Sequence, residues 1–216
     1  MKINMIYLAA GNSRRFGGNK LYSEIDGKPM FLYGLHALEA VLTVRQDTVL
    51  TVVSEYSRIR EYVEEKKKIY KERMILTGSP EREKGISYSI RAGLAVCEAD
   101  YYLFCVADQP WICHQTVLEL IEKTVDGGYA GGYVTWQDTS GNPAIFSAAL
   151  YPKLMALEGD TGGKKILKKR SDVCTVCARK QKELKDVDDR RAWKEALEGA
   201  GGSSVDNDTK ERGKRK

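Results

Sequence analysis

The spacing of hydrophobic residues along the chain switches repeatedly between two periods. Short apolar runs rich in β-branched or aromatic residues indicate strands, whereas apolar residues three or four positions apart indicate amphipathic helices. We predict strands over residues 3–9, 48–53, 74–77, 101–107, 134–136, 144–147 and 173–177. We predict helices over residues 30–42, 58–70, 86–97, 114–125, 149–157, 163–168 and 190–197. Residues 138–143, Asp-Thr-Ser-Gly-Asn-Pro, are expected to form a turn between two strands.

The order of these elements indicates the fold class. Strands and helices alternate through the first 125 residues, which is typical of a mostly parallel sheet joined by right-handed crossovers. The run 101–107 is dense in apolar residues, as expected for a strand that is buried on both faces. The sequence therefore predicts an α/β fold with a mostly parallel central sheet and a ligand crevice at the carboxyl ends of its strands.

Composition narrows the class of protein. The chain has 216 residues, of which 42% are hydrophobic, and a formal net charge of +5, which suits one globular domain, expected over residues 1–198. No apolar run approaches the roughly 20 residues that a membrane-spanning helix needs, and residues 1–8 indicate a first strand rather than a signal peptide. Residues 199–216 have almost no apolar content and are predicted to be a disordered basic tail.

The cysteines indicate the cellular compartment of the protein, and the clustered basic residues indicate which binding partners suit it. Five cysteines, an odd number without an export signal, predict free thiols and a cytoplasmic protein. Cys97, Cys105 and Cys113 are expected to be buried. A strand period of two would point Cys174 and Cys177 to opposite faces, which argues against a metal or redox pair. Nine basic residues between positions 164 and 185 suit phosphate-bearing small ligands, a partner protein or a solvated face. They lack the interleaved aromatic residues that the binding of single-stranded nucleic acid would need.

The segment after the first strand carries the most informative chemistry. Residues 8–20 read Leu-Ala-Ala-Gly-Asn-Ser-Arg-Arg-Phe-Gly-Gly-Asn-Lys. Small residues let the backbone approach a bulky ligand, and the amides of a glycine-containing loop bind phosphate oxygens. Arg15 and Lys20 add positive charge to the same loop. The loop is neither a Walker loop, since no Gly-Lys-Ser/Thr follows, nor the G-x-G-x-x-G dinucleotide pattern.

The whole pattern L-A-A-G-x-S-x-R-x-G-x-x-K resembles the signature of nucleotidyltransferases that activate small phosphorylated molecules with an NTP. It is most similar to that of the molybdenum cofactor cytidylyltransferases, within the MobA-like NTP transferases. The resemblance continues in Gly-Lys-Pro-Met at 27–30, Gly-Ile-Ser-Tyr-Ser at 85–89, Ala-Asp-Gln-Pro at 107–110, Gly-Asn-Pro at 141–143 and Gly-Asp-Thr-Gly at 159–162. It covers about residues 3–197 and implies a three-layer, Rossmann-like α/β fold.

The resemblance also implies a role for each motif. The implied nucleotide site consists of Leu8, Ala9, Ala10, Gly11, Ser13, Arg15, Lys20, Gly85, Ser87 and Ser89. The implied acceptor site consists of Asn142, Pro143, Asp160 and Gly162. The expected catalytic residues are Lys20, Arg15 and Asp108. An Ala-Ala pair at positions 9–10 goes with cytosine in these enzymes, whereas guanylyl-transferring relatives resemble Leu-Ala-Gly-Gly there, so CTP is the expected nucleotide.

Two carboxylates are expected to hold Mg²⁺. Asp108 ends the strand 101–107, so its carboxylate should emerge at the crevice, although an Asp before Pro110 also suits a turn cap. The resemblance implies Asp188 as the second ligand, but the family's following Thr-Pro-Glu-Asp is replaced by Asp-Arg-Arg-Ala at 189–192. Asp186 and Asp189 therefore stay open as alternatives, and an Asp that opens the last helix is also a common N-cap.

These features together predict an enzyme that transfers CMP from CTP to the phosphate of molybdopterin and releases pyrophosphate. The recipient molybdenum hydroxylase is an expected partner. One alternative is a cytidylyl- or uridylyltransferase that acts on a sugar or polyol phosphate, although the acceptor motifs favour the pterin. The other is a non-catalytic, nucleotide-binding maturation factor for a molybdenum hydroxylase. Intact Lys20 and Asp108 favour an enzyme, while the changed segment after Asp188 favours the maturation factor.

Overall fold

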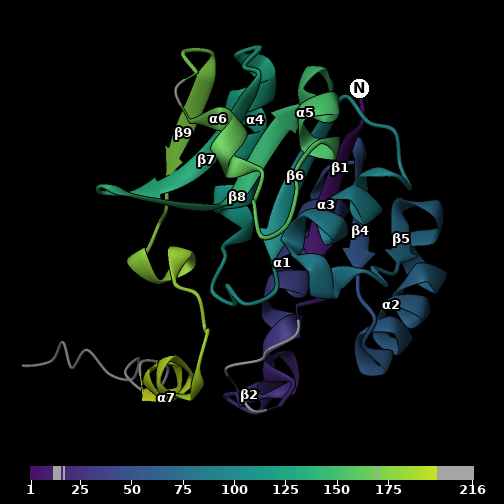
Figure 1. Cartoon of the computed structure of the whole chain (residues 1–216), viewed down its shortest axis with the longest axis vertical. Coiled ribbons are helices and arrows are strands. Elements are labelled where there is room, and N and C mark those ends of the chain that lie inside the picture. Colours follow the sequence, from purple (N-terminus) through teal and green to yellow (C-terminus); the bar gives the residue numbers. More distant parts are fainter. Residues whose placement is uncertain (12–15, 17, 169, 199–216) are drawn as a thin grey trace, which may run out of the picture.

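A seven-stranded sheet with the order β5-β4-β1-β6-β8-β7-β9 lies at the centre of the computed structural model, which describes residues 1–11, 16, 18–168 and 170–198 (Figure 1). The strands are β1 (Ile3–Leu8), β4 (Thr48–Val53), β5 (Met74–Thr77), β6 (Tyr101–Val106), β7 (Gly131–Trp136), β8 (Thr139–Ser147) and β9 (Val173–Cys177). Strand β8 pairs antiparallel with β6 and β7, and the other pairs of this sheet are parallel. The predicted mostly parallel sheet is confirmed.

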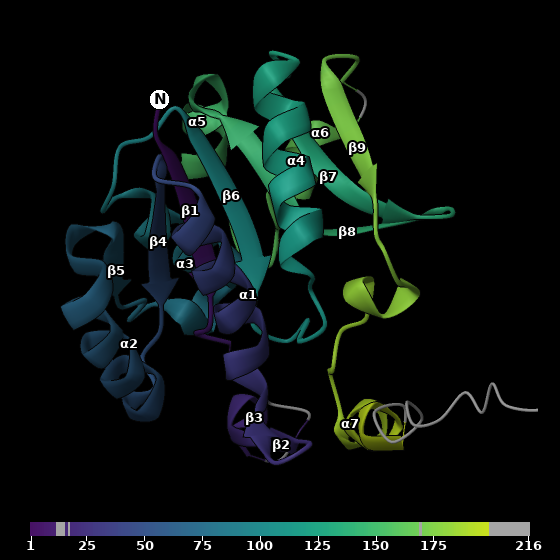
Figure 2. The ribbon, with the colours of Figure 1, turned by 180° about the vertical axis from the view of Figure 1, so that it is seen from behind.

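Helices cover both faces of the sheet. They are α1 (Met30–Val44), α2 (Ser57–Tyr70), α3 (Ile86–Leu94), α4 (His114–Asp126), α5 (Tyr151–Met155) and α6 (Lys164–Leu167), whereas α7 (Arg190–Glu198) lies away from this sheet, at one end of the molecule (Figure 1). Figure 1 shows α3, α5 and α6 in front of the sheet, and Figure 2 shows α1 and α4 in front of its other face. Two buried hydrophobic clusters match this division, one with α1, α2 and α4, the other with α3, α5 and α6. The three-layer architecture is therefore confirmed.

The central strand β1 explains the layering. Ile3, Met5 and Tyr7 belong to the cluster beneath α1, α2 and α4, whereas Ile6 and Leu8 belong to the cluster beneath α3. Alternate side chains of a strand point to opposite faces, and every residue of β1 is buried, so both faces of this strand must be covered. The last residue of β1 pairs with the last residues of β4 and β6, which brings three loops to one edge of the sheet.

The turn predicted over residues 138–143 is wrong. The hairpin between β7 and β8 turns at Gln137 and Asp138, where Gln137 has a φ of 50°, and β8 begins at residue 139. Asn142 and Pro143 thus lie inside a strand, and the ladder shifts its register opposite Tyr133 and Val134. Proline is tolerated in strands at such irregularities, where the ladder does not require its missing N–H.

Strand β7 begins earlier than predicted, at two glycines, which are disfavoured in strands. A Cβ atom at Gly132 would lie 2.7 Å from Oγ1 of Thr124 on α4 and 2.8 Å from Sγ of Cys174 on β9. Glycine is therefore needed here because α4 packs closely on the sheet. Packing that involves residues far apart in sequence overrides the local propensity.

Short elements account for most of the other differences from the prediction. The hairpin of β2 (Glu24–Ile25) and β3 (Lys28–Pro29) was not predicted, although Asp26-Gly27, both with positive φ, is a typical two-residue hairpin loop. The helix predicted over 86–97 ends at residue 94, and the one predicted over 149–157 is divided into a 3₁₀ turn and α5. The predicted tail, 199–216, lies outside the described residues.

The cysteine pattern follows the fold. Cys97, Cys105 and Cys174 are buried, Cys113 is half-buried and Cys177 is exposed. The opposite environments of Cys174 and Cys177 confirm the strand period of β9. Cys113 is less buried than predicted because it precedes α4 at the edge of a loop. Across the part of the chain that the structure describes, no helix is long and apolar enough to span a membrane.

Candidate active site

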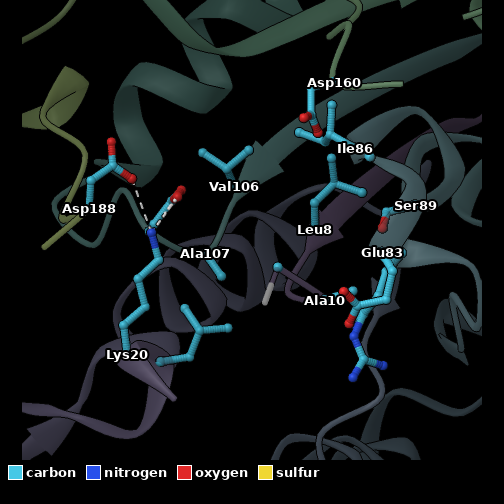
Figure 3. A pocket seen from close by; sticks show the side chains of 15 residues that line it. Leu8, Ala10, Lys20, Glu83, Ile86, Ser89, Val106, Ala107, Asp160 and Asp188 are labelled. Atoms are coloured by element: carbon cyan, nitrogen blue, oxygen red, sulfur yellow. Dashed lines mark hydrogen bonds and ion pairs between the residues drawn. The ribbon is translucent and has the colours of Figure 1, made fainter. Parts of the chain in front are cut away.

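A pocket of about 450 Å³ opens at the carboxyl ends of β1 and β6, where the topology predicts a crevice (Figure 3). Its lining comes from the ends of those two strands, from the 3₁₀ turn η1 (Lys20–Tyr22), from the turn η3 (Arg82–Lys84) and from the start of α3. Asp160 and Asp188 complete the lining. Segments that are far apart in sequence therefore share one site, because their strands end at the same edge of the sheet.

Lys20 lies between two carboxylates on one side of this pocket (Figure 3). Its Nζ is 2.9 Å from Oδ2 of Asp108 and 3.2 Å from Oδ1 of Asp188. The Lys20 side chain is only 10% exposed, whereas the carboxylates are 29% and 55% exposed. The two carboxylates thus converge on one cationic nitrogen and keep a side open to solvent.

Backbone and capping contacts position each of these three side chains. Lys20 opens the turn η1, which is capped by a hydrogen bond from the Leu21 N–H to Oδ1 of Asn19. Asp108 directly follows β6 and its buried neighbour Ala107. The segment before α7 is tied to this loop because the N–H of Val187 donates to the carbonyl of Asp108 at 2.9 Å. This last contact brings Asp188 to the pocket.

The charges at the site shift two pKa values. Burial by itself lowers the pKa of Lys20, but the hydrogen-bonded carboxylates of Asp108 and Asp188 outweigh it and the pKa is raised, so Lys20 is protonated at neutral pH. Asp186 is exposed as a residue, but its carboxyl is turned toward the protein. Partial desolvation, together with the negative charges of Asp108 and Asp188, raises its pKa, against a hydrogen bond from Gln109.

The structure gives the three aspartates before α7 different surroundings. Asp188 contacts Lys20 in the pocket. Asp186 accepts a hydrogen bond of 2.7 Å from Nε2 of Gln109. Asp189 accepts a hydrogen bond of 2.8 Å from the N–H of Ala192, three residues later, which is the geometry of a helix N-cap. Of the three, Asp188 is the one that faces the pocket together with Asp108.

The first loop supplies another part of the lining. Leu8, Ala10 and Gly11 line the pocket, whereas Ala9 is fully buried in the hydrophobic cluster on the α1 side of the sheet. The hydroxyl of Tyr56 donates to the carbonyl of Gly11, which anchors the start of the loop to the segment after β4. The other predicted nucleotide-binding residues of this loop, Ser13 and Arg15, lie outside the described residues.

The start of α3 forms the opposite side of the pocket, where Figure 3 places Ser89 and Glu83 across from Lys20. Gly85 has a φ of 124° and lines the pocket together with Ser89, whose hydroxyl donates to Oγ of Ser79. Ser87 is fully buried instead, and its Oγ has no hydrogen-bond partner among the described residues. Of the three residues predicted here, Gly85 and Ser89 thus reach the pocket surface.

The predicted acceptor residues are divided between two places. Asp160 lines the pocket, in a loop held against α3 by a hydrogen bond from the Ser87 N–H to the carbonyl of Gly159. Asn142 and Pro143 lie within β8, and Gly162 lies just before α6. None of these three residues lines the pocket. The structure therefore brings Asp160, but not the other three residues, into the lining of the same pocket as Lys20.

Charged residues that the sequence analysis did not single out also reach this site. Arg82 and Glu83 line the pocket from η3, and the Arg82 guanidinium carbon lies 5.4 Å from the centre of the Tyr56 ring. In sequence they belong to a run of charges before Gly85 that is typical of a solvated turn, so no local signal marks them. Lys164, one of the clustered basic residues, does not line the pocket, and its Nζ donates to the carbonyl of Ser140.

The donor set fits a divalent cation that binds together with phosphates. Within the described ranges, no group of three or more His, Cys, Asp and Glu side chains is arranged to hold a metal ion by itself. Asp108 and Asp188 do converge, since both lie within hydrogen-bond distance of one nitrogen. Mg²⁺ in enzymes is commonly held by one or two carboxylates plus substrate phosphates and water, so two carboxylates are sufficient.

Several proteins of known sequence are similar to this chain. The chain is 27% identical over 194 residues to the purine catabolism protein PucB of Bacillus subtilis, covering 85% of this chain and 90% of PucB. It is 29% identical over 126 residues to 2-C-methyl-D-erythritol 4-phosphate cytidylyltransferase of Caldanaerobacter subterraneus, covering 56% of this chain and 54% of that enzyme. It is 36% identical over 62 residues to a probable molybdenum cofactor guanylyltransferase of Pyrococcus horikoshii, covering 29% and 32%.

Solved structures share the fold. Rv0371c of Mycobacterium tuberculosis superposes with a TM-score of 0.71 at 22% identity, over 92% of this chain and 99% of that one. The same protein in complex with manganese gives a TM-score of 0.68 at 20% identity, over 92% and 99%. A family model described as the MobA-like NTP transferase domain matches residues 5–173. The protein therefore belongs to the MobA-like NTP transferase family and is a nucleotidyltransferase of that family.

Proposed function

We propose that the protein transfers CMP from CTP to the phosphate of molybdopterin and releases pyrophosphate, with Mg²⁺ as the metal. The observation that carries this proposal is Lys20, held between Asp108 and Asp188 at the edge of the sheet. The arrangement offers a protonated amine for phosphate oxygens and two carboxylates for a cation in one pocket. Asp108 and Asp188 would hold Mg²⁺, which when bound neutralises phosphate charge.

The reaction needs no general base from the protein. A phosphate monoester has its second pKa near about 6, so the acceptor is largely ionised at neutral pH. An oxygen of that phosphate forms a bond to the α-phosphorus of CTP in line. The bond from that phosphorus to the bridging oxygen breaks, and the electron pair leaves with pyrophosphate. The protein contributes position and charge, which are the main sources of catalysis in phosphoryl transfer.

Each part of the pocket has a task in this proposal. The ammonium of Lys20 lies against the α-phosphate and stabilises the charge that develops on it. The amides around Gly11, with Arg15, bind the β- and γ-phosphates. Gly85 and Ser89 contact the nucleoside from the opposite wall. Ser87 supports that wall from beneath, since it is fully buried.

CTP is the proposed nucleotide because of Ala9 and Ala10. Ala9 is fully buried, and Ala10, which lines the pocket, is 2% exposed. In the cytidylyltransferases that the chain resembles, an Ala-Ala pair at this position accompanies recognition of cytosine. The cytidylyltransferases among the relatives support the same assignment, whereas the guanylyltransferases favour GTP.

In this proposal the acceptor binds beside Asp160, and Asn142, Pro143 and Gly162, which do not line the pocket, contact the part of the acceptor that extends beyond it. Lys164 adds a positive charge there, whose pKa is lowered by burial and by the nearby Lys168, against the attraction of Asp186. A cation of this kind suits an anionic pterin. We also propose the cytoplasm as the place of the reaction, because all five cysteines are free thiols, and the recipient molybdenum hydroxylase as the partner that takes the product.

A polyol phosphate is the second candidate acceptor. The observation that favours it is the likeness to cytidylyltransferases of 2-C-methyl-D-erythritol 4-phosphate. The chain spans about half of the length of those enzymes.

Pyrophosphate release tests the proposal. The protein is incubated with Mg²⁺, one of four NTPs, and either molybdopterin or 2-C-methyl-D-erythritol 4-phosphate, and the product is identified by mass spectrometry. Release with CTP and molybdopterin is expected. Release only with the polyol phosphate would replace the acceptor, and preference for GTP would overturn the cytosine assignment. CTP binding without release under any condition would favour the non-catalytic maturation factor.

A further inference from the structure

The C-terminal helix α7 contacts the segment that precedes Lys20. Figures 1 and 2 both show α7 beside the hairpin of β2 and β3, at one end of the molecule. Phe16, which is 5% exposed, lies at this junction. The Nε of Arg190 donates to the carbonyl of Phe16 at 3.1 Å, and its guanidinium carbon is 5.9 Å from the centre of the Phe16 ring.

Trp193, one helical turn after Arg190, completes the contact. Its ring meets the Phe16 ring edge to face, with centroids 6.4 Å apart and an interplanar angle of 82°. Its indole N–H donates to the carbonyl of Glu24 in β2 at 3.2 Å. Phe16 is therefore held by a hydrogen bond to its backbone, a cation near its ring and an aromatic edge contact.

One residue of this contact, Arg190, stands where the sequence departs from the family pattern. Arg190 lies in the Asp-Arg-Arg-Ala segment that replaces Thr-Pro-Glu-Asp, two residues after Asp188. Phe16 lies between Gly11 and Lys20, which both line the pocket. The C-terminal segment thus contacts the segment that ends at Lys20 from Asp188 to Lys20 and from Arg190 and Trp193 to Phe16.

We propose that Arg190, supported by Trp193, is a positioning residue that holds Phe16, and with it the turn that begins at Lys20, in place for the triphosphate of the nucleotide. The inference rests on the proposed function, in which the first loop binds the β- and γ-phosphates and Lys20 lies against the α-phosphate. Phe16 cannot move away from α7 without breaking the hydrogen bond that Arg190 donates to its carbonyl. A binding segment that is held in place beforehand loses less freedom when the triphosphate binds, which increases affinity.

The experiment compares two arginines that are adjacent in sequence. Arg190→Met removes the guanidinium and keeps an unbranched side chain of similar length. Arg191→Met makes the same charge change on the same helix, but Arg191 is 89% exposed and pairs with Glu195 instead of the loop. Binding of tripolyphosphate and of CTP, each with Mg²⁺, is measured by calorimetry on the full chain. Steady-state pyrophosphate release gives KM for CTP and kcat.

Arg190→Met is expected to weaken tripolyphosphate binding about tenfold, equivalent to about 1.4 kcal/mol, and to raise KM for CTP more than it lowers kcat. Arg191→Met is expected to bind as the wild type does, and Arg190→Lys to recover part of the loss. Equal binding by the two methionine variants would overturn the positioning role alone. A wild type that binds neither ligand would instead overturn the proposed function.

A second variant keeps the inference testable if Arg190→Met does not fold. Trp193→Phe retains an aromatic ring against Phe16 and removes only the N–H that donates to Glu24. It is expected to weaken tripolyphosphate binding about threefold, because the variant loses one ordinary hydrogen bond that helps to hold Phe16 in place. Unchanged tripolyphosphate binding in Trp193→Phe would overturn the part assigned to Trp193, and unchanged binding in a folded Arg190→Lys would overturn the part assigned to the guanidinium.

Discussion

Replacing Gly85 by alanine is expected to destabilise the protein and to weaken nucleotide binding together. The glycine lies where the start of α3 meets the loop that carries Asp160. A Cβ atom at this position would lie well inside van der Waals contact of the carbonyl group of Gly159 and 2.7 Å from the Asp160 nitrogen. These are backbone atoms, so no side-chain rotation relieves the contact.

Two costs combine at Gly85. A φ of 124° with a ψ of 169° belongs to a region that is essentially restricted to glycine, and an alanine there costs about 1–3 kcal/mol. Inserting a methyl group into a closely packed site costs typically a further 1–3 kcal/mol. The sum, about 2–6 kcal/mol, is a large part of the 5–15 kcal/mol by which domains are usually stable.

Urea unfolding of the purified variants measures the effect. Gly128→Ala is the matched control, since Gly128 also has a positive φ, of 63°, but a Cβ there meets nothing within 4 Å. The control is expected to lose about 1–2 kcal/mol through its backbone conformation alone. Gly85→Ala should lose distinctly more stability. Its KM for CTP should rise because the start of α3 and the loop of Asp160 are pushed apart. Equal losses in the two variants would refute the close packing of these loops.

Three further predictions concern single side chains. Asp188→Ala should lower kcat by about 10²-fold or more, whereas Asp189→Ala should cost about 1 kcal/mol of stability, as a lost helix cap does, with kcat near that of the wild type. Equal kcat values in these two variants would contradict the assignment of Asp188. The pKa of Asp186 is raised in the folded protein, so its contribution to stability is full below its ordinary pKa of 3.8 and is lost as the pH rises through the folded value. Asp186→Asn should therefore unfold at higher urea than the wild type at pH 7, with the difference vanishing at low pH. Iodoacetamide followed by mass spectrometry should label the exposed Cys177 in the native protein and Cys105 only after unfolding, because burial raises the pKa of the Cys105 thiol.

Much of the fold could be predicted because local patterns and long-range packing agree in it. The strands over 48–53, 74–77 and 173–177 begin and end where the apolar runs do. The prediction fails where tertiary contacts overrule local preference. At Gly132 the strand carries a glycine because α4 leaves no space for a side chain. Asn142-Pro143 is tolerated within β8 because the ladder shifts its register there.

The candidate site could be predicted to a similar extent. Lys20 and Asp108 both follow strands that neighbour each other in the sheet, so their meeting follows from topology. The roles of the three aspartates near position 188 could not be separated in advance. Their directions depend on a backbone hydrogen bond between Val187 and Asp108, across 79 positions of the chain, and no local pattern encodes that contact.

The measurement that tests the central claim most directly is pyrophosphate release by Lys20→Met, beside Lys68→Met, which makes the same charge change on the exposed side of α2. Lys20 is the one group that contacts both Asp108 and Asp188 in the described part of the pocket. Removing a charge that stabilises a transition state lowers kcat by about 10²–10³-fold, so this loss is expected for Lys20→Met and none for Lys68→Met. A folded Lys20→Met variant that keeps the wild-type kcat would contradict the account.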